Sequence, residues 1–141
     1  MPTNLQIKFI KSLQLKKNRQ EYRQFVCEGR KIVEELIAYR NVYIESIYAT
    51  EEMITQHDIH HPKLEIVSSS DMERMTGLKT SPQILALVQY FEIDTCYQPQ
   101  PISLYLDDIS DPGNLGTILR TAEWYGLHTV YASPNTVDIY N

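Results

Sequence analysis

The sequence predicts an α/β protein in two parts. Residues 1–97 are expected to form a three-layer α/β/α domain, and residues 98–141 the first β-α-β unit of a parallel α/β domain. Short apolar runs typical of strands alternate along the chain with segments of helical periodicity, which favours a layered α/β architecture. Residues 92–101 have the Pro, Gln and Asp content of a linker. We therefore place the domain boundary near Tyr97.

The first domain is expected to begin with a helix. Thr3 and Gln6 have the spacing of a capping box at its start, and its apolar face includes Leu5. Residues 25–29 then read as a strand that ends at a glycine, and residues 30–39 read as a second amphipathic helix.

Three further strands are expected at residues 42–49, 64–67 and 84–90. The last is a continuous apolar run, which is consistent with burial on both faces of a sheet. Short helices are expected between these strands, one capped by Thr50 and one starting at a second capping box at Ser70.

The β-α-β unit lies in residues 101–141. Apolar residues alternate with period two over residues 102–106, and Asp111-Pro112-Gly113-Asn114 is then a turn signal. The next segment has a single apolar helical face, formed by Leu115, Ile118, Leu119, Ala122 and Tyr125. Gly126 ends this helix, and residues 128–132 supply the second strand.

Four polar residues lie off the apolar face of this helix, namely Asn114, Thr117, Arg120 and Thr121. A loop that leaves the carboxyl end of a strand and enters a helix is where open α/β sheets bind ligands. The free N–H groups of the helix start favour an anion such as phosphate. Arg120 is the candidate contact, because a guanidinium can clamp phosphate oxygens in a fork that lysine cannot match.

The segment LDDISDPGNLGTILRTAEWYG, residues 106–126, resembles the first signature motif of the SpoU (TrmH-like) family of RNA 2′-O-ribose methyltransferases. The resemblance implies a SPOUT catalytic domain whose C-terminal part forms a trefoil knot, S-adenosylmethionine as the cofactor held by that knot, and a homodimeric enzyme. It places the catalytic arginine at Arg120 and the motif asparagine at Asn114, with Gly113 and Gly116 shaping the ligand loop.

The segments KSLQLKKNRQEYRQFVCEGRKIVEELI and TSPQILALV resemble the substrate-binding domain that precedes the catalytic domain in many SpoU enzymes. That domain is similar to ribosomal protein L30e and is thought to grip RNA. The resemblance therefore implies an L30e-like fold and an RNA partner, either tRNA or rRNA, for residues 1–97.

The charge distribution is uneven. The chain carries a net charge of −5, but residues 1–31 hold eight basic and two acidic residues, a balance of +6, so the other 110 residues carry −11. Lys16, Lys17, Arg19 and Arg23 are the candidate phosphate contacts within this basic segment. The alternative is that the charges form an ordinary solvated helix face.

Composition favours a globular protein of the cytoplasm. The chain is 43% hydrophobic and 22% charged, and no apolar run approaches the length of a membrane span. Two cysteines, Cys27 and Cys96, in ordinary hydrophobic runs suggest a reducing compartment and no disulfide. No Cys or His spacing indicates a zinc site.

The function expected is S-adenosylmethionine-dependent 2′-O-methylation of tRNA or rRNA. The second and third SpoU motifs, and with them the knot, do not occur in the 141 residues. We therefore expect a piece of a longer enzyme that by itself binds no cofactor and transfers no methyl group. A stand-alone L30e-like RNA-binding module is one alternative. A nucleotide-binding or structural α/β protein is the other, although residues 113–116 lack the G-x-G-x-x-G spacing of a Rossmann site.

Overall fold

The computed structural model describes residues 2–39, 42–92 and 100–141. Contacts between residues divide the chain into two compact units, a first unit of residues 1–91 and a second unit of residues 92–141. The predicted boundary at Tyr97 falls among residues 93–99, outside the described part of the chain.

The first unit contains a mixed four-stranded sheet. Its strands lie in the order β1 (Gln24–Glu28), β4 (Ile84–Gln89), β2 (Ile44–Ala49) and β3 (Leu64–Ile66). Strands β1 and β2 pair antiparallel with β4, whereas β3 pairs parallel with β2. The prediction of strands at these four places is confirmed.

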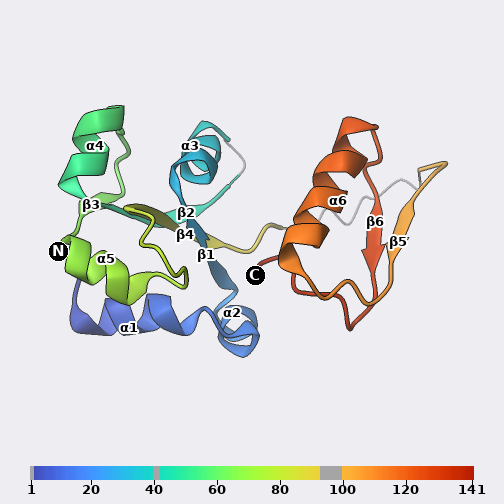
Figure 1. Cartoon of the computed structure of the whole chain (residues 1–141), viewed down its shortest axis with the longest axis horizontal. Helices are drawn as coiled ribbons and strands as arrows, with labels where there is room; N and C mark the ends of the chain where they lie inside the picture. Colours follow the sequence, from blue (N-terminus) through green and yellow to red (C-terminus); the bar gives the residue numbers. More distant parts are fainter. Residues whose placement is uncertain (1, 40–41, 93–99) are drawn as a thin grey trace. The chain divides into compact units, whose positions relative to one another are not determined.

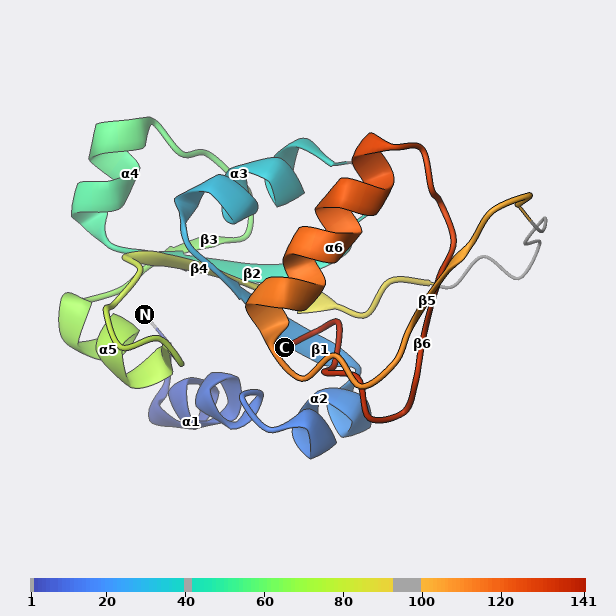
Figure 2. The same ribbon diagram turned by 45° about the vertical axis from the view of Figure 1, so that its right-hand side comes forward.

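Helices cover both faces of this sheet. In Figures 1 and 2, α3 (Arg30–Ala38) and α4 (Glu51–His57) lie on one face, and α1 (Asn4–Ser12) and α5 (Ser69–Met75) lie on the other. The short helix α2 (Lys16–Tyr22) follows α1 and contacts β1. The first unit thus has the three-layer α/β/α arrangement that the alternation of strands and helices predicts.

Strand β4 is the centre of the hydrophobic core. It has a paired neighbour on each side and helices over both faces, so the five residues from Ile84 to Val88 are all buried. This confirms the expectation from its continuous apolar sequence. On the face covered by α1 and α5, the core cluster consists of Ile7, Ile10, Tyr48, Val67, Met72, Met75 and Leu85.

Two helix details differ from the prediction. The Thr3–Gln6 capping box is present, but α1 turns Ile7 and Ile10 onto the sheet and leaves Leu5 80% exposed. The start of α5 is capped by Ser68, whose hydroxyl accepts the N–H of Asp71, rather than by a box at Ser70. For α1, the contact with the sheet selects one of two apolar faces that the sequence allows.

The second unit is the predicted β-α-β unit. Strands β5 (Leu104–Leu106) and β6 (Val130–Ala132) pair parallel, and α6 (Pro112–Trp124) connects them. Leu115 and Ala122 of α6 are buried, but Tyr125, expected on the same apolar face, lies just past the helix and is 77% exposed. None of the helices formed by the described residues is long and apolar enough to cross a membrane.

Candidate functional site

The start of α6 is closed by the protein's own carboxylate. The Asp111 side chain is the N-cap, and its Oδ2 accepts the N–H of Asn114 at 2.7 Å. Pro112 follows at the first helical position, where its missing N–H costs nothing. The expectation that these N–H groups receive a phosphate is therefore wrong for this helix start, since the Asp111 carboxylate already occupies it. The Asp-Pro pair is the sequence signal for such a cap.

The Arg120 guanidinium lies along the exposed side of α6 and points back toward the helix start. Its Nη2 donates to Thr117 Oγ1 at 3.4 Å, and the Thr117 hydroxyl in turn donates to the carbonyl oxygen of Gly113 at 2.9 Å. Within the part of the chain that the structure describes, no carboxylate forms an ion pair with Arg120. Most of its five N–H donors are thus available to an anion.

Asn114 and Arg120 both lie on α6. They are separated by less than two turns of α6, and both are exposed. The backbone N–H of Asn114 donates to the capping carboxylate of Asp111. The Asn114 side chain leaves the helix about one turn before that of Thr117. Amide, hydroxyl and guanidinium groups therefore follow one another along the exposed side of α6.

Gly113 and Gly116 do not shape a loop, because both lie within the first two turns of α6. Neither has a positive φ; in the preceding loop it is Asp108 that adopts one, at 55°. A Cβ at Gly113 would lie 3.1 Å from Asp111 Oδ2, so this glycine leaves room for the capping carboxylate. A Cβ at Gly116 would lie 3.5 Å from Arg120 Nη1. Gly116 thus leaves space beside the guanidinium.

We expect Gly116→Ala to stabilise the second unit while impairing methyl transfer in the complete enzyme. Alanine in a helix interior is favoured over glycine by about 0.5–1 kcal/mol, and a contact of 3.5 Å is sterically acceptable. The added methyl group would nevertheless restrict the movement of the Arg120 side chain. Urea unfolding and a methylation assay test the two effects. Full activity in the variant would show that Gly116 serves only helix packing, and Ala122→Gly is the reverse control for helix stability.

A network of buried hydroxyl groups joins the loops that follow β5 and β6. Ser133 donates its N–H to the carbonyl of Leu106 at 2.9 Å, and its hydroxyl accepts the N–H of Asp108 at 3.0 Å. The Thr136 hydroxyl donates to the same Leu106 carbonyl at 3.3 Å. These bonds hold the β5 loop that leads into α6. The sequence contains no signal for this network, because its partners are separated by more than 20 residues.

Three of the four candidate phosphate contacts in the first unit are exposed. Lys16 and Lys17 form the first turn of α2, and Arg23 ends that helix in the left-handed conformation with φ of 52°. The Arg23 guanidinium lies 5.7 Å from the centroid of the Tyr90 ring. These side chains remain available to a polyanion.

Arg19 is the exception. It is only 4% exposed, and its Nη1 donates to the carbonyl oxygens of Leu13 and Gln14, each at 2.9 Å. These carbonyls lie at the corner between α1 and α2, where no helical N–H reaches them. The prediction that Arg19 contacts phosphate is therefore wrong in this structure, because the guanidinium is consumed in closing the corner.

The described residues indicate neither a metal site nor a reactive cysteine. In residues 2–39, 42–92 and 100–141, no three His, Cys, Asp or Glu side chains are placed to hold a metal ion. Burial raises the pKa of the Cys27 thiol to about 12, so the thiolate that reacts or binds metal is not formed near neutral pH. Cys96 lies outside the described residues.

The chain is similar in sequence to a known domain family and to RNA methyltransferases. Residues 4–86 match the family described as the MRM3-like substrate binding domain. The chain is 29% identical over 144 aligned residues to the 23S rRNA (guanosine(2553)-2′-O)-methyltransferase RlmP of Bacillus subtilis, which covers 98% of this chain and 55% of that protein. It is also 29% identical over 132 residues to the mitochondrial rRNA methyltransferase 3B of Danio rerio, covering 83% of this chain and 28% of the relative.

The fold is also similar to that of a solved rRNA methyltransferase structure. The AdoMet-bound rRNA methyltransferase from Sinorhizobium meliloti superposes with a TM-score of 0.75 at 26% identity, covering 99% of this chain and 55% of that one. The chain thus spans about half the length of that protein and of RlmP. Since the family match extends over more than half of the chain, the chain belongs to the MRM3-like substrate-binding domain family, and its homologues are SpoU (TrmH-like) rRNA 2′-O-methyltransferases.

Proposed function

We propose that this chain belongs to an S-adenosylmethionine-dependent RNA 2′-O-ribose methyltransferase of the cytoplasm, homodimeric when complete and acting on rRNA or tRNA. The observation that carries the proposal is the exposed Arg120 guanidinium on α6, the helix that also carries Asn114, in a chain with a relative that is named as a 23S rRNA 2′-O-methyltransferase. The deciding experiment is transfer of labelled methyl groups to RNA by the complete enzyme, with the product analysed for 2′-O-methylribose.

S-adenosylmethionine would supply the methyl group. The start of α6 offers no free helix end for the cofactor's carboxylate, because Asp111 occupies that end. We therefore assign no residue of this chain to the cofactor. The proposal includes that residues 1–141 alone transfer no methyl group, and calorimetric detection of tight cofactor binding by this chain would contradict it.

The role of Arg120 follows from its chemistry. A ribose 2′-hydroxyl is a weak nucleophile and must lose its proton as it is alkylated. Arg120 cannot take that proton, because a guanidinium remains protonated at any ordinary pH. It can hold the adjacent RNA phosphate and stabilise the negative charge that develops on the 2′-oxygen. The proton then passes to a phosphate oxygen or to water.

The first unit is proposed to bind the RNA through α2. Lys16 and Lys17 are exposed on the first turn of this helix, and Arg23 is exposed directly after its end. Side chains of this kind contact phosphates and release counterions on binding, which makes affinity strongly salt-dependent. The presence of a 2′-hydroxyl as the reacting group accounts for RNA rather than DNA as the substrate.

We expect the double substitution Lys16→Gln and Lys17→Gln to weaken RNA binding by roughly tenfold at low salt. Each lost phosphate contact is also expected to lower the slope of log K against log salt concentration by about 0.7–1. Fluorescence anisotropy with a labelled RNA at several salt concentrations measures both quantities.

The matched control is Lys31→Gln with Lys79→Gln, which removes two exposed lysines that lie outside α2. We expect little change in this control. If the control weakens binding more than the α2 variant does, the RNA contact lies at α3 and the loop after α5 instead.

A second candidate function is an RNA-binding module without catalysis. It is favoured by the family match, since residues 4–86 lie entirely within the first unit. Salt-dependent RNA binding combined with no methyl transfer by the complete protein would select this function.

A further inference from the structure

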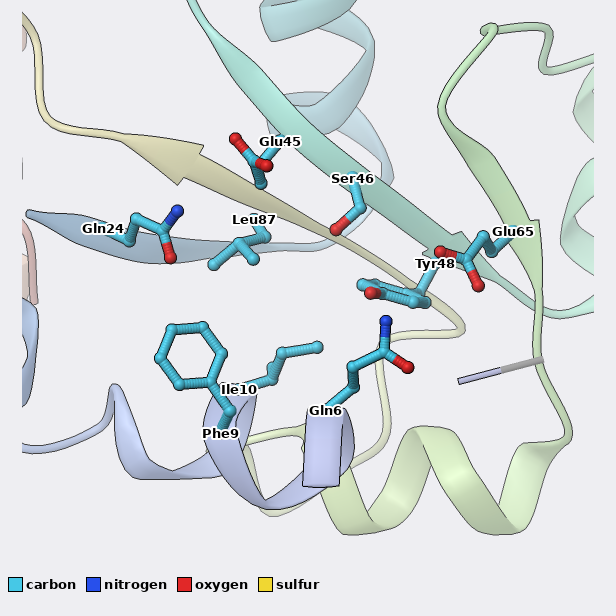
Figure 3. Close-up of a pocket in the computed structure, with 9 residues that line it drawn as sticks. All are labelled: Gln6, Phe9, Ile10, Gln24, Glu45, Ser46, Tyr48, Glu65 and Leu87. Atoms are coloured by element: carbon cyan, nitrogen blue, oxygen red, sulfur yellow. The ribbon is translucent and has the colours of Figure 1, made fainter. Parts of the chain in front are cut away.

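A polar pocket in the first unit has no role in the proposed reaction. It lies between α1 and the sheet and has a volume of about 330 Å³. Figure 3 shows the side chains of Gln6, Phe9 and Ile10 on α1 facing residues from all four strands across this space. The other lining residues are Gln24, Glu45, Ser46, Tyr48, Glu65 and Leu87. This volume is at the lower end of the range of about 300–1,000 Å³ for small-molecule sites, which suits a single nucleobase.

A β-bulge in β2 places the exposed residue Glu45 at the rim of this pocket. Ile44 pairs with Val88, but Ser46 pairs with the adjacent residue Leu87, so Glu45 is the extra residue between them. Paired residues share a face of the sheet. The bulge therefore turns Ser46 to the face of Leu87 and α1, and both Glu45 and Ser46 line the pocket. Bulges re-aim side chains in this way next to binding sites.

The carboxylate of Glu45 is exposed and has acceptor capacity left for a ligand. Its Oε2 accepts a long hydrogen bond of 3.3 Å from Gln89 Nε2. A carboxylate offers about four acceptor positions on its two oxygens, so it can still accept two parallel N–H groups. Deeper in the pocket, burial raises the pKa of the Tyr48 phenol, which therefore stays neutral near pH 7.

The pocket adjoins the basic helix α2. The Phe9 ring that lines it meets the Tyr22 ring edge to face, with centroids 5.0 Å apart and an interplanar angle of 83°. Tyr22 is the last residue of α2, and Gln24, which also lines the pocket, follows it by two positions. A nucleotide whose base entered the pocket would thus lie beside the end of α2, which the exposed Arg23 follows.

We propose that this pocket binds one unpaired guanine base of the RNA, with Glu45 accepting from guanine N1–H and the 2-amino group and Phe9 contacting the ring. The proposal rests on the proposed function, namely that the first unit binds RNA. Guanine is the base that presents two adjacent donors on its Watson–Crick edge, whereas the other bases present an acceptor there that a carboxylate would repel. Single-stranded bases are commonly read by such edge contacts combined with an aromatic side chain.

The experiment compares heptaribonucleotides that contain one central guanosine, inosine or adenosine among uridines. Affinities for the 141-residue chain are measured by fluorescence anisotropy at low salt. We expect guanosine to bind about tenfold more tightly than adenosine, since a bidentate contact discriminates by roughly 5- to 150-fold. Inosine, which lacks the 2-amino group, is expected to fall between them.

Three variants test the residues. Glu45→Gln keeps the shape of the side chain but replaces one acceptor by a donor, and it is expected to abolish the preference for guanosine. Glu35→Gln is the matched control, because Glu35 is exposed on α3 on the opposite face of the sheet. Phe9→Leu is expected to weaken all three RNAs by a similar factor and to preserve their ratio. Unfolding midpoints within about 2 °C of the parent chain confirm that Glu45→Gln and Glu35→Gln are folded.

Equal affinity for guanosine and adenosine, or an unchanged preference in Glu45→Gln, would overturn the proposal while leaving RNA binding by α2 intact. If no oligonucleotide binds even at low salt, the proposed RNA-binding function fails together with the pocket. If hexaarginine binds the chain while the three oligonucleotides bind with equal affinity, the pocket is a site for a cationic peptide. That result also overturns the guanine proposal.

Discussion

Replacing Arg120 with lysine in the complete enzyme is expected to lower the rate of RNA 2′-O-methylation by about 100-fold or more. Removal of one donor that stabilises a developing oxyanion typically reduces kcat by roughly 10²–10³. Lysine retains the positive charge but lacks the planar fork that grips two phosphate oxygens. The Arg120 guanidinium is exposed and hydrogen-bonds to the exposed Thr117 hydroxyl, so the substitution leaves no buried group of the described residues without a partner.

The measurement is incorporation of labelled methyl groups under single-turnover conditions, with kcat and KM for RNA determined separately. A fall confined to kcat would place Arg120 at the reacting hydroxyl, whereas a rise confined to KM would limit it to RNA binding. Arg30→Lys is the matched control, since Arg30 is a partly exposed helix arginine paired with Glu34 in the first unit. Near-normal kcat and KM in the Arg120 variant would remove this residue from the chemistry.

The substitution Arg19→Met is expected to lower the free energy of unfolding of the first unit by about 3 kcal/mol. Methionine fills a similar volume, but the carbonyl oxygens of Leu13 and Gln14 lose the charged donor that now lies 2.9 Å from each. Hydrogen bonds to a charged group contribute about 1.5–3 kcal/mol, and a buried acceptor left unpaired costs about 1–3 kcal/mol. The same substitution at exposed Arg23 is expected to change stability by less than 1 kcal/mol.

Urea unfolding followed by circular dichroism measures both variants. Similar stability of the Arg19 and Arg23 variants would mean that water satisfies the two carbonyls when the guanidinium is removed. Such a result would return Arg19 to the candidate RNA contacts. A large loss in Arg19→Met alone would establish that the basic segment contains one residue that maintains the fold among others that face solvent.

The elements whose periodicity is strong were predictable. Alternation over residues 102–106 and the 3.6-residue spacing after Leu115 correctly identified β5 and α6, because each pattern is compatible with only one secondary structure. The apolar run of β4 likewise predicted burial on both faces. The Thr3 capping box was correct because its two hydrogen bonds involve residues three positions apart and do not depend on distant packing.

The assignments that depended on distant contacts were not predictable. Arg19 resembles its basic neighbours in sequence, and only the fold of the corner between α1 and α2 buries it. The capping carboxylate of Asp111 changes the helix start from a phosphate site into a closed end. The bulge at Glu45 depends on the register between β2 and β4, which are separated by about forty residues in the chain.

The sequence by itself determined the order and type of the elements and the presence of the SpoU motif, because local periodicity, capping and short contiguous motifs are properties of neighbouring residues. The tertiary structure decided which polar side chains remain available. A guanidinium or carboxylate becomes a binding group or a structural one according to the backbone groups that packing places around it, and those groups come from other parts of the chain. Arg120, left exposed, and Arg19, held by two carbonyls, show both outcomes for the same residue type.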